Sequence, residues 1–509
     1  MSPPDFIALR NAQAVPRSRI SDLPFARFRE LVVDAVSDGQ RVAALFGDVA
    51  GSSGKVELYV VLADRTRALL RIGKTTLDED RFPSLTTDCA QVHLFEREVA
   101  EQYGVRPVGH PWFKPVRFHE SFRPGHDAWD RARGVRPVIG VTDYFRVEGE
   151  EIHEVAVGPV HAGVIEPGHF RFQCHGEHVF HLEISLGYQY RGAERTLVGG
   201  PNKRTLHTME TLAGDTSVGH ATAYSQAVEA LAGRHVTVRA EALRGIALEL
   251  ERLANHTGDL GALAGDVGFL PSASYCGRLR GDFLNLTALL CGNRFGRGLV
   301  RPGGVGFDLD EARRQECPQR LESAVGDVAN AADLLWNSTS VQARFEGTGT
   351  VSTATAEALG LVGPAARACG LENDVRHDFP AGIFRFAQVP VSSWTTGDVF
   401  ARAYVRWLEI QRSAAFIKDE LQAFPEGPIR VELGPLKADH VVVSLVEGWR
   451  GEICHVALTD AAGRFSRYKV VDPSFHNWTG LALALRNQQI SDFPLCNKSF
   501  NLSYCGHDL

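Results

Sequence analysis

The sequence has 509 residues, a formal net charge of −7 and 44% hydrophobic residues. A chain of this length exceeds what one hydrophobic core organises, so at least two domains are expected. The weak negative charge argues against a nucleic-acid-binding surface. No apolar run reaches the roughly 20 residues that cross a bilayer, and the first residues lack the basic and apolar regions of a signal peptide. We therefore expect a cytoplasmic protein that reaches a membrane only through partner subunits.

Nine cysteines are spread along the chain, and the closest two are Cys496 and Cys505. Because no CxxC pair exists, neither a disulfide framework nor a local zinc or iron–sulfur site is expected. The sequence instead predicts that most of these cysteines are buried as small hydrophobic residues.

Residues 1–125 predict a small α/β domain. Residues 41–47 and 56–62 are rich in apolar and β-branched side chains and are bounded by Gly, Asp and Ser clusters, which is typical of strands. Residues 91–103 predict a helix that ends at Gly104. Residues 126–150 are rich in Arg, Gly, Pro and Asp and predict a linker.

Residues 151–509 predict a mainly helical domain with β-sheet at its edges. Strands are expected from 158 to 184 and again within 429–471. Helical periodicity is found over 206–232, 237–262, 273–290, 315–337 and 396–423. The expected fold class is therefore α+β, with a small α/β module fused to a mainly helical module.

The stretch 212–229 combines a flexible loop with a helix. Its first half holds two glycines and a Ser/Thr/Asp cluster that would cap a helix, and Tyr224 and Val228 share one face of the second half. A loop that leads into a buried helix suits a cofactor, yet this loop contains no thiol.

Several ordered motifs carry a resemblance to a known family. Residues 158–172, 186–194 and 249–261 resemble the large subunit of membrane-bound, energy-converting [NiFe] hydrogenases, a fold shared with the quinone-reactive 49-kDa-type subunit of respiratory complex I. The N-terminal motifs at 82–85, 95–98, 103–105 and 109–111 resemble the 30-kDa-type subunit of complex I. A fusion of the two in this order is typical of formate-hydrogenlyase-type large subunits.

The resemblance also implies a metal site that this sequence does not complete. Family hydrogenases hold nickel with four thiolates, two of which also bridge to iron, and soft sulfur suits that centre. The corresponding positions here are Ala213, Thr216, Ser503 and Gly506, and Cys505 is one residue out of register. We therefore expect no metal ligands and no cofactor in this chain, and hydrogen activation is disfavoured.

The resemblance does not support a quinone site of the complex I design either. The tyrosine that would contact the quinone headgroup falls at about Gly214. The histidine of the opening hairpin has two candidates, His161 and His169, but the local pattern follows the hydrogenase form.

Two groups of residues are candidate catalytic side chains, because they correspond to segments that line the active cleft in the family. Glu166, His161 and His169 lie in the hairpin that lines the cleft in the family, where a carboxylate beside imidazoles can relay protons. The alternative is that they hydrogen-bond backbone in a tight Gly/Pro hairpin. Asp215, Thr216 and His220 occupy the loop that corresponds to the family's metal loop, where they could bind a hard cation or a proton, or cap the helix.

A further pair, Asp374 and Arg376, resembles the paired charges that the family places near its cofactor. A buried Asp–Arg pair is also an ordinary structural device. On the long predicted helix, Glu249, Glu251 and Arg252 could carry charge toward a membrane arm or form ion pairs along one helix face.

The functional expectation is a subunit of a membrane-associated, hydrogenase-related or NADH-quinone-oxidoreductase-like complex that couples electron transfer to ion translocation without a NiFe centre. The expected partners are an iron–sulfur small subunit and a ferredoxin-like subunit, which would hold the Fe–S clusters, and antiporter-like membrane subunits on the cytoplasmic face of the membrane. Two alternatives stay open: a structural scaffold with a closed relic cleft, and a quinone-reactive subunit that uses residues other than those of complex I.

Overall fold

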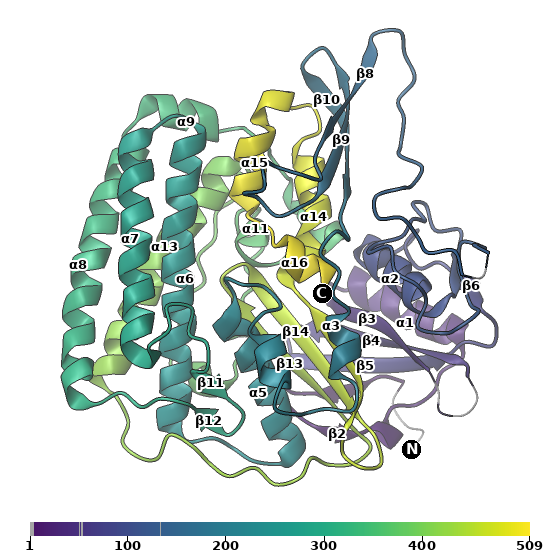
Figure 1. The fold of residues 1–509 in the computed structure, drawn as a ribbon, viewed down its shortest axis with the longest axis horizontal. Helices are drawn as coiled ribbons and strands as arrows, with labels where there is room; N and C mark the ends of the chain where they lie inside the picture. The colour runs from purple at the N-terminus through teal and green to yellow at the C-terminus, as the bar shows by residue number, and fades with distance from the viewer. Residues whose placement is uncertain (1–4, 50, 52–53, 133) are drawn as a thin grey trace.

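The computed structural model describes residues 5–49, 51, 54–132 and 134–509, and it confirms a mixed α+β architecture (Figure 1). The N-terminal module is built on an antiparallel sheet of order β1-β5-β4-β3. Its strands are β1 (Ile7–Leu9), β3 (Arg41–Val49), β4 (Val56–Asp64) and β5 (Leu69–Thr76), and its helices are α1 (Phe25–Ser37) and α2 (His93–Tyr103). The predicted strands and helix of this module are thereby confirmed, and Gly104 ends α2 in the left-handed conformation.

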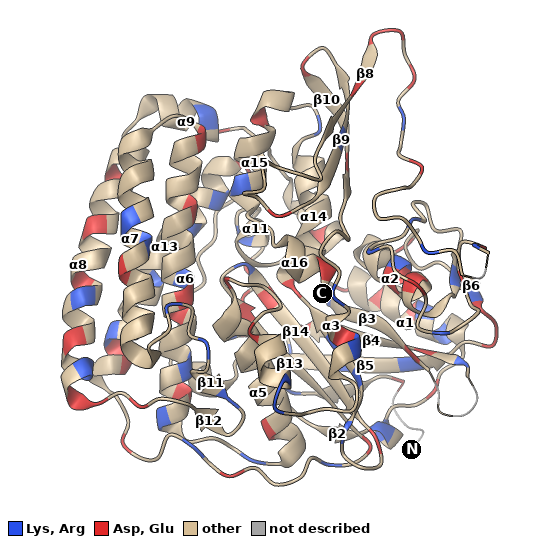
Figure 2. Cartoon of the chain, viewed as in Figure 1, with Lys and Arg blue, Asp and Glu red and all other residues tan. Residues whose placement is uncertain are grey.

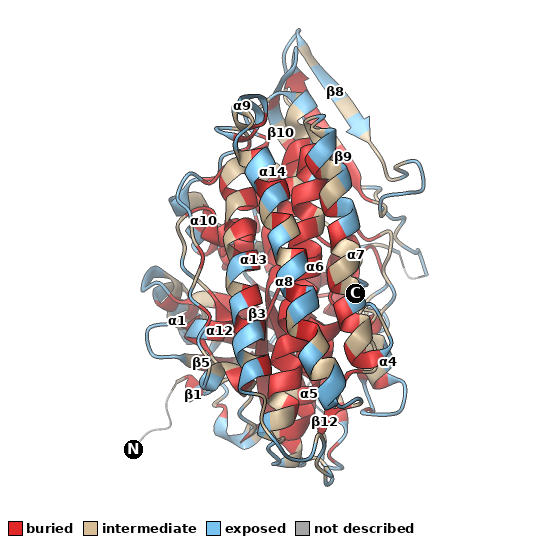
Figure 3. Cartoon of the chain, turned by 90° about the vertical axis from the view of Figure 1, so that its left-hand side faces the viewer, coloured by how far each residue is buried: buried red, intermediate tan, exposed pale blue. Residues whose placement is uncertain are grey.

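A layer of long helices forms the opposite side of the molecule (Figure 1). Its members are α6 (Val238–Asp266), α7 (Leu270–Cys291), α8 (Glu311–Trp336) and α13 (Val399–Gln422). Three of these helices begin at a side-chain cap, supplied by Thr237, Asp310 and Asp398. Figure 3 shows α6 buried behind α7 and α8, whereas the outer face of α8 is exposed. Helix α6 is therefore an interior helix, and it carries the buried charged residues Glu249, Arg252 and Asp259.

A second antiparallel sheet, of order β15-β14-β13-β2, lies between the two modules. Its strands are β2 (Val15–Pro16), β13 (His440–Gly448), β14 (Gly451–Thr459) and β15 (Phe465–Val471), and α5 (Ser217–Ala232) packs against it. One hydrophobic core contains Phe46 and Tyr59 of the N-terminal module together with Val443 and Val456 of this sheet. The first and last parts of the chain thus share a core and an edge strand.

A hairpin sheet projects beyond the rest of the molecule (Figure 1). It consists of β8 (Ile152–Val157), β9 (His169–His175) and β10 (His178–Ser185), in the order β10-β9-β8. The prediction of strands from residue 158 was wrong for 158–168, which form the loop between β8 and β9. Pro159, Pro167 and the glycines of this segment lack either a backbone donor or a side chain to pack, so they do not continue a strand.

The predicted helix over 206–232 is interrupted. Residues 210–216 separate the short helix α4 (Thr205–Met209) from α5. The other short elements are α3 (Ala193–Leu197), α9 (Thr339–Phe345), α10 (Thr353–Leu359), α11 (Gly363–Arg367), α12 (Val375–Asp378), β6 (Arg81–Pro83), β7 (Arg106–Val108), β11 (Val300–Arg301) and β12 (Gly304–Val305). The 3₁₀ helices are η1 (Arg17–Arg19), η2 (Ala90–Val92), η3 (Gly382–Arg385) and η4 (Ile490–Asp492).

The C-terminal tail returns to the interior. It comprises α14 (Pro473–Ala484), α15 (Phe493–Phe500) and α16 (Tyr504–Asp508), and the C-terminus lies near the middle of the molecule (Figure 1). Asp508 accepts hydrogen bonds from the backbone N–H groups of Gly187 at 2.8 Å and Gln189 at 2.9 Å. The tail is therefore fixed beside the segment that follows β10.

Candidate functional site

The four positions that correspond to the family's metal ligands lie in two segments, the loop before α5 and the turn into α16. Ala213 and Thr216 are completely buried, and Ser503 is buried as well. The Thr216 hydroxyl accepts hydrogen bonds from Trp449 Nε1 at 3.2 Å and from Arg450 Nη1 at 3.3 Å. Ser503 caps α16 through a 2.9 Å hydrogen bond from the Gly506 N–H to its hydroxyl. The two oxygen-bearing side chains thus already have protein partners.

The fourth position, Gly506, faces the carboxylate of Asp472. Acidic and basic residues occur along both the helices and the sheets of the molecule (Figure 2). A Cβ added to Gly506 would stand 2.6 Å from the Cγ of Asp472. Asp472 cannot turn away freely, because its carboxylate accepts hydrogen bonds from His220 Nε2 at 3.1 Å and from the Ser474 N–H at 2.8 Å. A cysteine at position 506 would collide with this fixed carboxylate.

A buried chain of hydrogen bonds leads away from Asp472. His220 Nδ1 lies 3.1 Å from His455 Nε2, and His455 Nδ1 lies 2.9 Å from the hydroxyl of Tyr468. All four side chains are fully buried. Burial lowers the pKa of His455 far below its ordinary value, so this imidazole stays neutral. The chain can pass a proton between its members, because each imidazole nitrogen has a hydrogen-bond partner.

Asp215 is held by Arg450 from the turn between β13 and β14. The guanidinium donates to both carboxylate oxygens, at 2.5 and 2.8 Å, and also to the Asn501 carbonyl at 2.5 Å. Burial alone would raise the pKa of Asp215, but the Arg450 charge overcomes it and lowers that pKa. The ring of Trp449 lies 3.9 Å from the same guanidinium. The loop before α5 is thus joined to the turn between β13 and β14 by a bidentate ion pair.

These residues do not fit a NiFe centre. The four positions offer two hydroxyls, a methyl group and a glycine that has no room for a side chain, whereas the centre needs thiolates. The one nearby thiol, Cys505, lies 3.4 Å from the Ser503 hydroxyl, and burial together with the Glu166 carboxylate raises the pKa of Cys505 to about 11. Across the described residues, no three His, Cys, Asp or Glu side chains are grouped as a metal site.

The hairpin residues make local bonds. His161 Nε2 lies 2.9 Å from the Gly168 carbonyl, and His169 Nδ1 lies 3.2 Å from the Gly158 carbonyl. Both imidazoles therefore brace the loop between β8 and β9. Glu166 is half-buried. Its carboxylate interacts with Cys505 of the C-terminal tail and contributes to the raised pKa of that thiol.

A cavity of about 610 Å³ opens between this hairpin, the end of α6 and α15. Its apolar wall includes Phe170, Phe172 and Phe493, which pack ring against ring. Its polar lining residues are His161, Ser491, Asn497, Lys498, Asn501, Tyr504 and Asp259. A site of this size and lining suits a largely apolar ligand or the apolar side chains of a partner protein.

A continuous network of buried charges runs along α6. Arg376 pairs with Asp374 at 2.6 Å and with Glu249 at 3.0 Å, which confirms the predicted Asp–Arg pair as buried. Glu249 also pairs with Arg252, three residues along the same helix, at 3.1 Å. Glu249 and Arg252 thus form ion pairs, one of the two expected alternatives, although in the interior. Glu251 instead accepts hydrogen bonds from the Val218 and Gly219 N–H groups.

Glu409 of α13 extends the network toward the cavity. It pairs with Arg252 at 3.2 Å and with His256 at 2.7 Å, and it receives Arg367 at 2.6 Å. Asp259, which lines the cavity, lies 3.9 Å from His256. Arg406 pairs with Asp259 at 2.7 Å. A chain of ionisable side chains therefore joins the middle of α6 to the cavity wall.

Sequence reasoning missed Arg367, Glu409 and Asp259. The available signal was a set of charged residues at helical spacing within otherwise apolar segments, which marks a buried network when the helix has no exposed face.

The fold, with a 30-kDa-type module packed on a mainly helical module, is that of a component of an energy-converting respiratory complex. Residues 26–129 match the family described as respiratory-chain NADH dehydrogenase, 30 Kd subunit, and residues 266–438 match its 49 Kd subunit. A chain of the membrane-bound sulfane sulfur reductase, an archaeal respiratory membrane complex, shares the fold with a TM-score of 0.66 at 22% identity, over 71% of this chain and 99% of that chain.

Sequence relatives cover between 66% and 92% of the chain. Formate hydrogenlyase subunit 5 of Escherichia coli (strain K12) is 28% identical over 92% of this chain and 84% of its own length. The carbon monoxide-induced hydrogenase of Rhodospirillum rubrum is 30% identical over 69% of this chain and 97% of its own length. An NADH-quinone oxidoreductase subunit of Clostridium beijerinckii is 31% identical over 66% of this chain and 91% of its own length. The chain belongs to the family that unites these hydrogenases with the 49-kDa-type subunits of NADH-quinone oxidoreductases.

Proposed function

We propose that this chain is the cleft-forming subunit of a membrane-associated energy-converting complex and that it works without a NiFe centre. The observation that carries the proposal is the fixed carboxylate of Asp472 against Gly506. It closes one ligand position to any side chain. The buried ion pairs from Glu249 through Arg252, Glu409 and His256 lead to Asp259 at the cavity wall. Such a series of charges could pass a change at the cavity on to a partner subunit.

The proposed partners are an iron–sulfur small subunit, a ferredoxin-like subunit and antiporter-like membrane subunits. The membrane-bound relatives support the membrane subunits. The loop between β8 and β9 supports a docking protein, because its residues Val160, Val164 and Ile165 expose 77%, 87% and 51% of their surface. Ile165 also lines the cavity. Exposed apolar side chains in a group mark an interaction surface. We assign this surface to the iron–sulfur small subunit.

The proposed location is the cytoplasmic face of the membrane, through the partner subunits. Within the described residues, no helix is both long and apolar enough to cross a membrane, so attachment would come from the other subunits.

A second candidate function is quinone reduction at the 610 Å³ cavity. Its aromatic wall would hold a ring, and His161 and Tyr504 would supply hydrogen bonds to the ring oxygens. A third candidate, a scaffold whose cleft is filled by its own side chains, rests on the Asp215–Arg450 and Asp472–His220 pairs.

The test is native purification of the complex through a tag on this chain, followed by identification of its subunits and by quinone reduction assays. Co-purified iron–sulfur and membrane subunits are the expected result. Quinone reduction that is lost on Tyr504→Phe would favour the second candidate. A chain that purifies alone from membranes and cytosol would contradict membership of such a complex.

A further inference from the structure

Two buried glutamates stand directly opposite each other near the turn of the β13–β14 hairpin. Glu447 of β13 is the register partner of Glu452 of β14, next to the Gly448–Gly451 pair. Each of the two glutamates exposes 4% of its surface. Directly opposite residues of an antiparallel pair share one face of the sheet, with Cβ atoms about 4.5–5.5 Å apart, and like charges in that position destabilise the pairing. Two ionised carboxylates here would therefore repel each other in the interior.

Both glutamates line a pocket of about 40 Å³ between the N-terminal module and the segment 362–379. Gly39 and Arg65 also line this pocket, and both are exposed, so the pocket reaches the surface. One water needs about 10–15 Å³ of such volume. The pocket can therefore admit water to the pair.

Three of the four carboxylate oxygens of the pair have hydrogen-bond donors. Glu447 accepts from Arg367 Nη1 at 2.8 Å and from the Val375 N–H at 3.0 Å. Glu452 Oε2 accepts from Arg41 Nη2. The remaining oxygen, Glu452 Oε1, is buried and has no hydrogen-bond partner within the described residues. A buried carboxylate oxygen without a donor is costly.

The guanidiniums beside the pair do not balance its charge. Arg41 forms its ion pair with Glu452. Arg367 is shared, because it lies 2.8 Å from Glu447, 2.6 Å from Glu409 and 3.6 Å from Asp374. The ion pairs of this group join three guanidiniums to four carboxylates, which are Arg252, Arg367 and Arg376 with Glu249, Asp374, Glu409 and Glu447. One negative charge remains next to Glu452 Oε1.

The ionisable groups of the neighbouring strands and of α14 add no charge to the pair. Burial lowers the pKa of His476 to about 3, so this imidazole is neutral. Burial raises the pKa of the Cys454 thiol, which therefore stays protonated. Lys469 of β15 forms its ion pairs elsewhere, with Glu98 at 2.6 Å and with Glu194 at 3.0 Å.

The charged groups on the other sides of the pocket do not supply the missing cation either. Arg65 is exposed and donates to the amide oxygen of Asn373 at 2.6 Å. Asp378 adds a further carboxylate, and its partner is His377 at 3.0 Å. His256 contacts the carboxylate of α13 and is thus separated from the pair by two ion pairs.

A second cross-strand pair of carboxylates shows how such a pair is balanced. Asp48 of β3 is the register partner of Glu57 of β4. Arg17 lies 3.7 Å from Asp48 and 3.8 Å from Glu57, and Lys74 lies 2.7 Å from Glu57. In the part of the chain that the structure describes, no cation joins the two carboxylates of the β13–β14 pair in this way.

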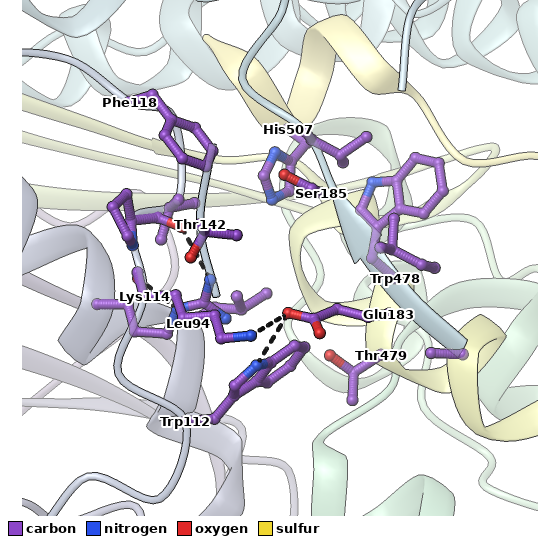
Figure 4. A pocket seen from close by; sticks show the side chains of 16 residues that line it. Leu94, Trp112, Lys114, Phe118, Thr142, Glu183, Ser185, Trp478, Thr479 and His507 are labelled. Atoms are coloured by element: carbon purple, nitrogen blue, oxygen red, sulfur yellow. Dashed lines mark hydrogen bonds and ion pairs between the residues drawn. The ribbon is translucent and has the colours of Figure 1, made fainter. Parts of the chain in front are cut away.

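Another pocket of about 40 Å³ contains a single matched carboxylate (Figure 4). Glu183 accepts there from Lys114 Nζ at 2.5 Å, from Trp112 Nε1 at 3.3 Å and from the Phe145 N–H at 2.7 Å. Figure 4 shows the ammonium of Lys114 and the indole of Trp112 both directed at this carboxylate. Glu183 is buried like the hairpin glutamates but has its own cation.

We propose that Glu447 and Glu452 form a proton-binding site, in which the two carboxyl groups hold one proton between them and exchange it with solvent through the pocket. The proton supplies the positive charge that the ion pairs lack, and it occupies the oxygen that has no donor. The oxygens of the facing carboxylate keep lone pairs that can accept its hydrogen bond. The assignment is independent of the proposed function, because it requires no partner subunit and no redox step.

The pKa of Glu447 agrees with this arrangement. Burial, and after it the Asp374 carboxylate, raises that pKa to about 7, although the neighbouring guanidiniums act in the opposite direction. The pair therefore takes up a proton near neutral pH, where an ordinary glutamate is ionised. Because Arg367 joins Glu447 to Glu409, loss of this proton changes the charge at one end of the buried network.

The experiment is infrared difference spectroscopy of the full chain during a pH titration across neutrality. It uses the Glu251→Gln background, because burial raises the pKa of Glu251 to about 8 and its carboxyl group would overlap. The expected result is a carbonyl band of a protonated carboxylic acid that shifts in D₂O and disappears as the pH rises through about 7. Absence of such a band would overturn the proposal, as would a proton carried by His256 instead, since an imidazole gives no such band.

Single substitutions show whether the proton belongs to the pair. Glu447→Gln removes the excess negative charge, and Glu452→Gln leaves Arg41 as an unmatched cation beside Glu447, so each should abolish the band. Glu183→Gln is the control and should leave it unchanged. A band that persists in either hairpin variant would place the proton on one residue and contradict a shared site. If one of these variants does not fold, the titration of the background and the other variant decide.

Discussion

Asp472 stands against Gly506 so closely that a side chain on the glycine would begin 2.6 Å from the carboxyl carbon of the aspartate. The same carboxylate is hydrogen-bonded to His220 and caps α14. The position that corresponds to a metal ligand in hydrogenases is therefore occupied here by a glycine against a carboxylate that has its own hydrogen-bond partners.

The first prediction concerns this contact. Gly506→Ala should lower the free energy of unfolding by about 1–3 kcal/mol, because the added methyl group overlaps a fixed carboxylate. Gly277→Ala, in α7, is the matched control, since a Cβ there meets nothing within 4 Å, and it should be neutral or slightly stabilising. Urea unfolding of both variants measures the difference, and equal stabilities would show that Asp472 moves aside.

The second prediction concerns the buried network. Arg367→Met should destabilise the protein by about 3–5 kcal/mol, because Glu409 and Glu447 would lose their shared guanidinium in the interior. Arg278→Met removes two ion pairs of a half-exposed arginine and should cost about 0–1 kcal/mol. Chemical denaturation compares the two, and a loss near that of the surface control would mean that the network contributes little.

The third prediction concerns Glu251, whose pKa burial raises to about 8. Its folded-state pKa lies above the unfolded value of about 4.3, so between these pH values the folded chain binds more protons. Stability from this group is therefore complete below about pH 4.3 and falls by up to about 1.4 kcal/mol per pH unit as the pH rises toward the folded pKa.

Glu251→Gln tests this, because glutamine cannot ionise. It keeps an oxygen for one of the two N–H groups, of Val218 and Gly219, that now donate to the two oxygens of Glu251, so the slope with pH and not the absolute stability is the readout. The unfolding free energy of this variant should decline less steeply between pH 5 and 8, while the exposed control Glu346→Gln should follow the wild type. This pH range lies between the unfolded-state pKa of about 4.3 and the folded-state pKa of about 8. Parallel curves for all three proteins would contradict the assigned pKa.

The fourth prediction concerns the proposed docking surface. Val164→Asp should release the iron–sulfur small subunit from the natively purified complex, because it places a charge in an apolar contact. Leu334→Asp, on α8 and 54% exposed, is the control and should leave the subunit composition unchanged. Quantitative mass spectrometry of the tagged complexes measures the ratio, and retention of the small subunit by Val164→Asp would place its binding surface elsewhere.

The sequence was sufficient for the elements with strong local signals. Residues 237–262 became α6, and the strand patterns at 41–47 and 56–62 became β3 and β4, because periodicity and caps act locally. All nine cysteines lie in the described part of the chain, and every one except Cys505 is buried, as their scattered spacing predicted.

Contacts between distant segments could not be predicted from the sequence. The pairing of Val15 with Val441, and of His220 with Asp472, joins residues that no local pattern relates. The strand prediction was wrong for residues 158–168, where Val160, Val164 and Ile165 are exposed in a loop. Tertiary context decides such segments.

Nickel content is the measurement that bears most directly on the central proposal. The complex would be purified natively through a tag on this chain and analysed by elemental mass spectrometry, with nickel as the element because partner clusters supply iron in any case. We predict no stoichiometric nickel in a preparation that contains iron–sulfur and membrane subunits. One nickel per chain would contradict a metal-free cleft and would require ligands other than Ala213, Thr216, Ser503 and Gly506.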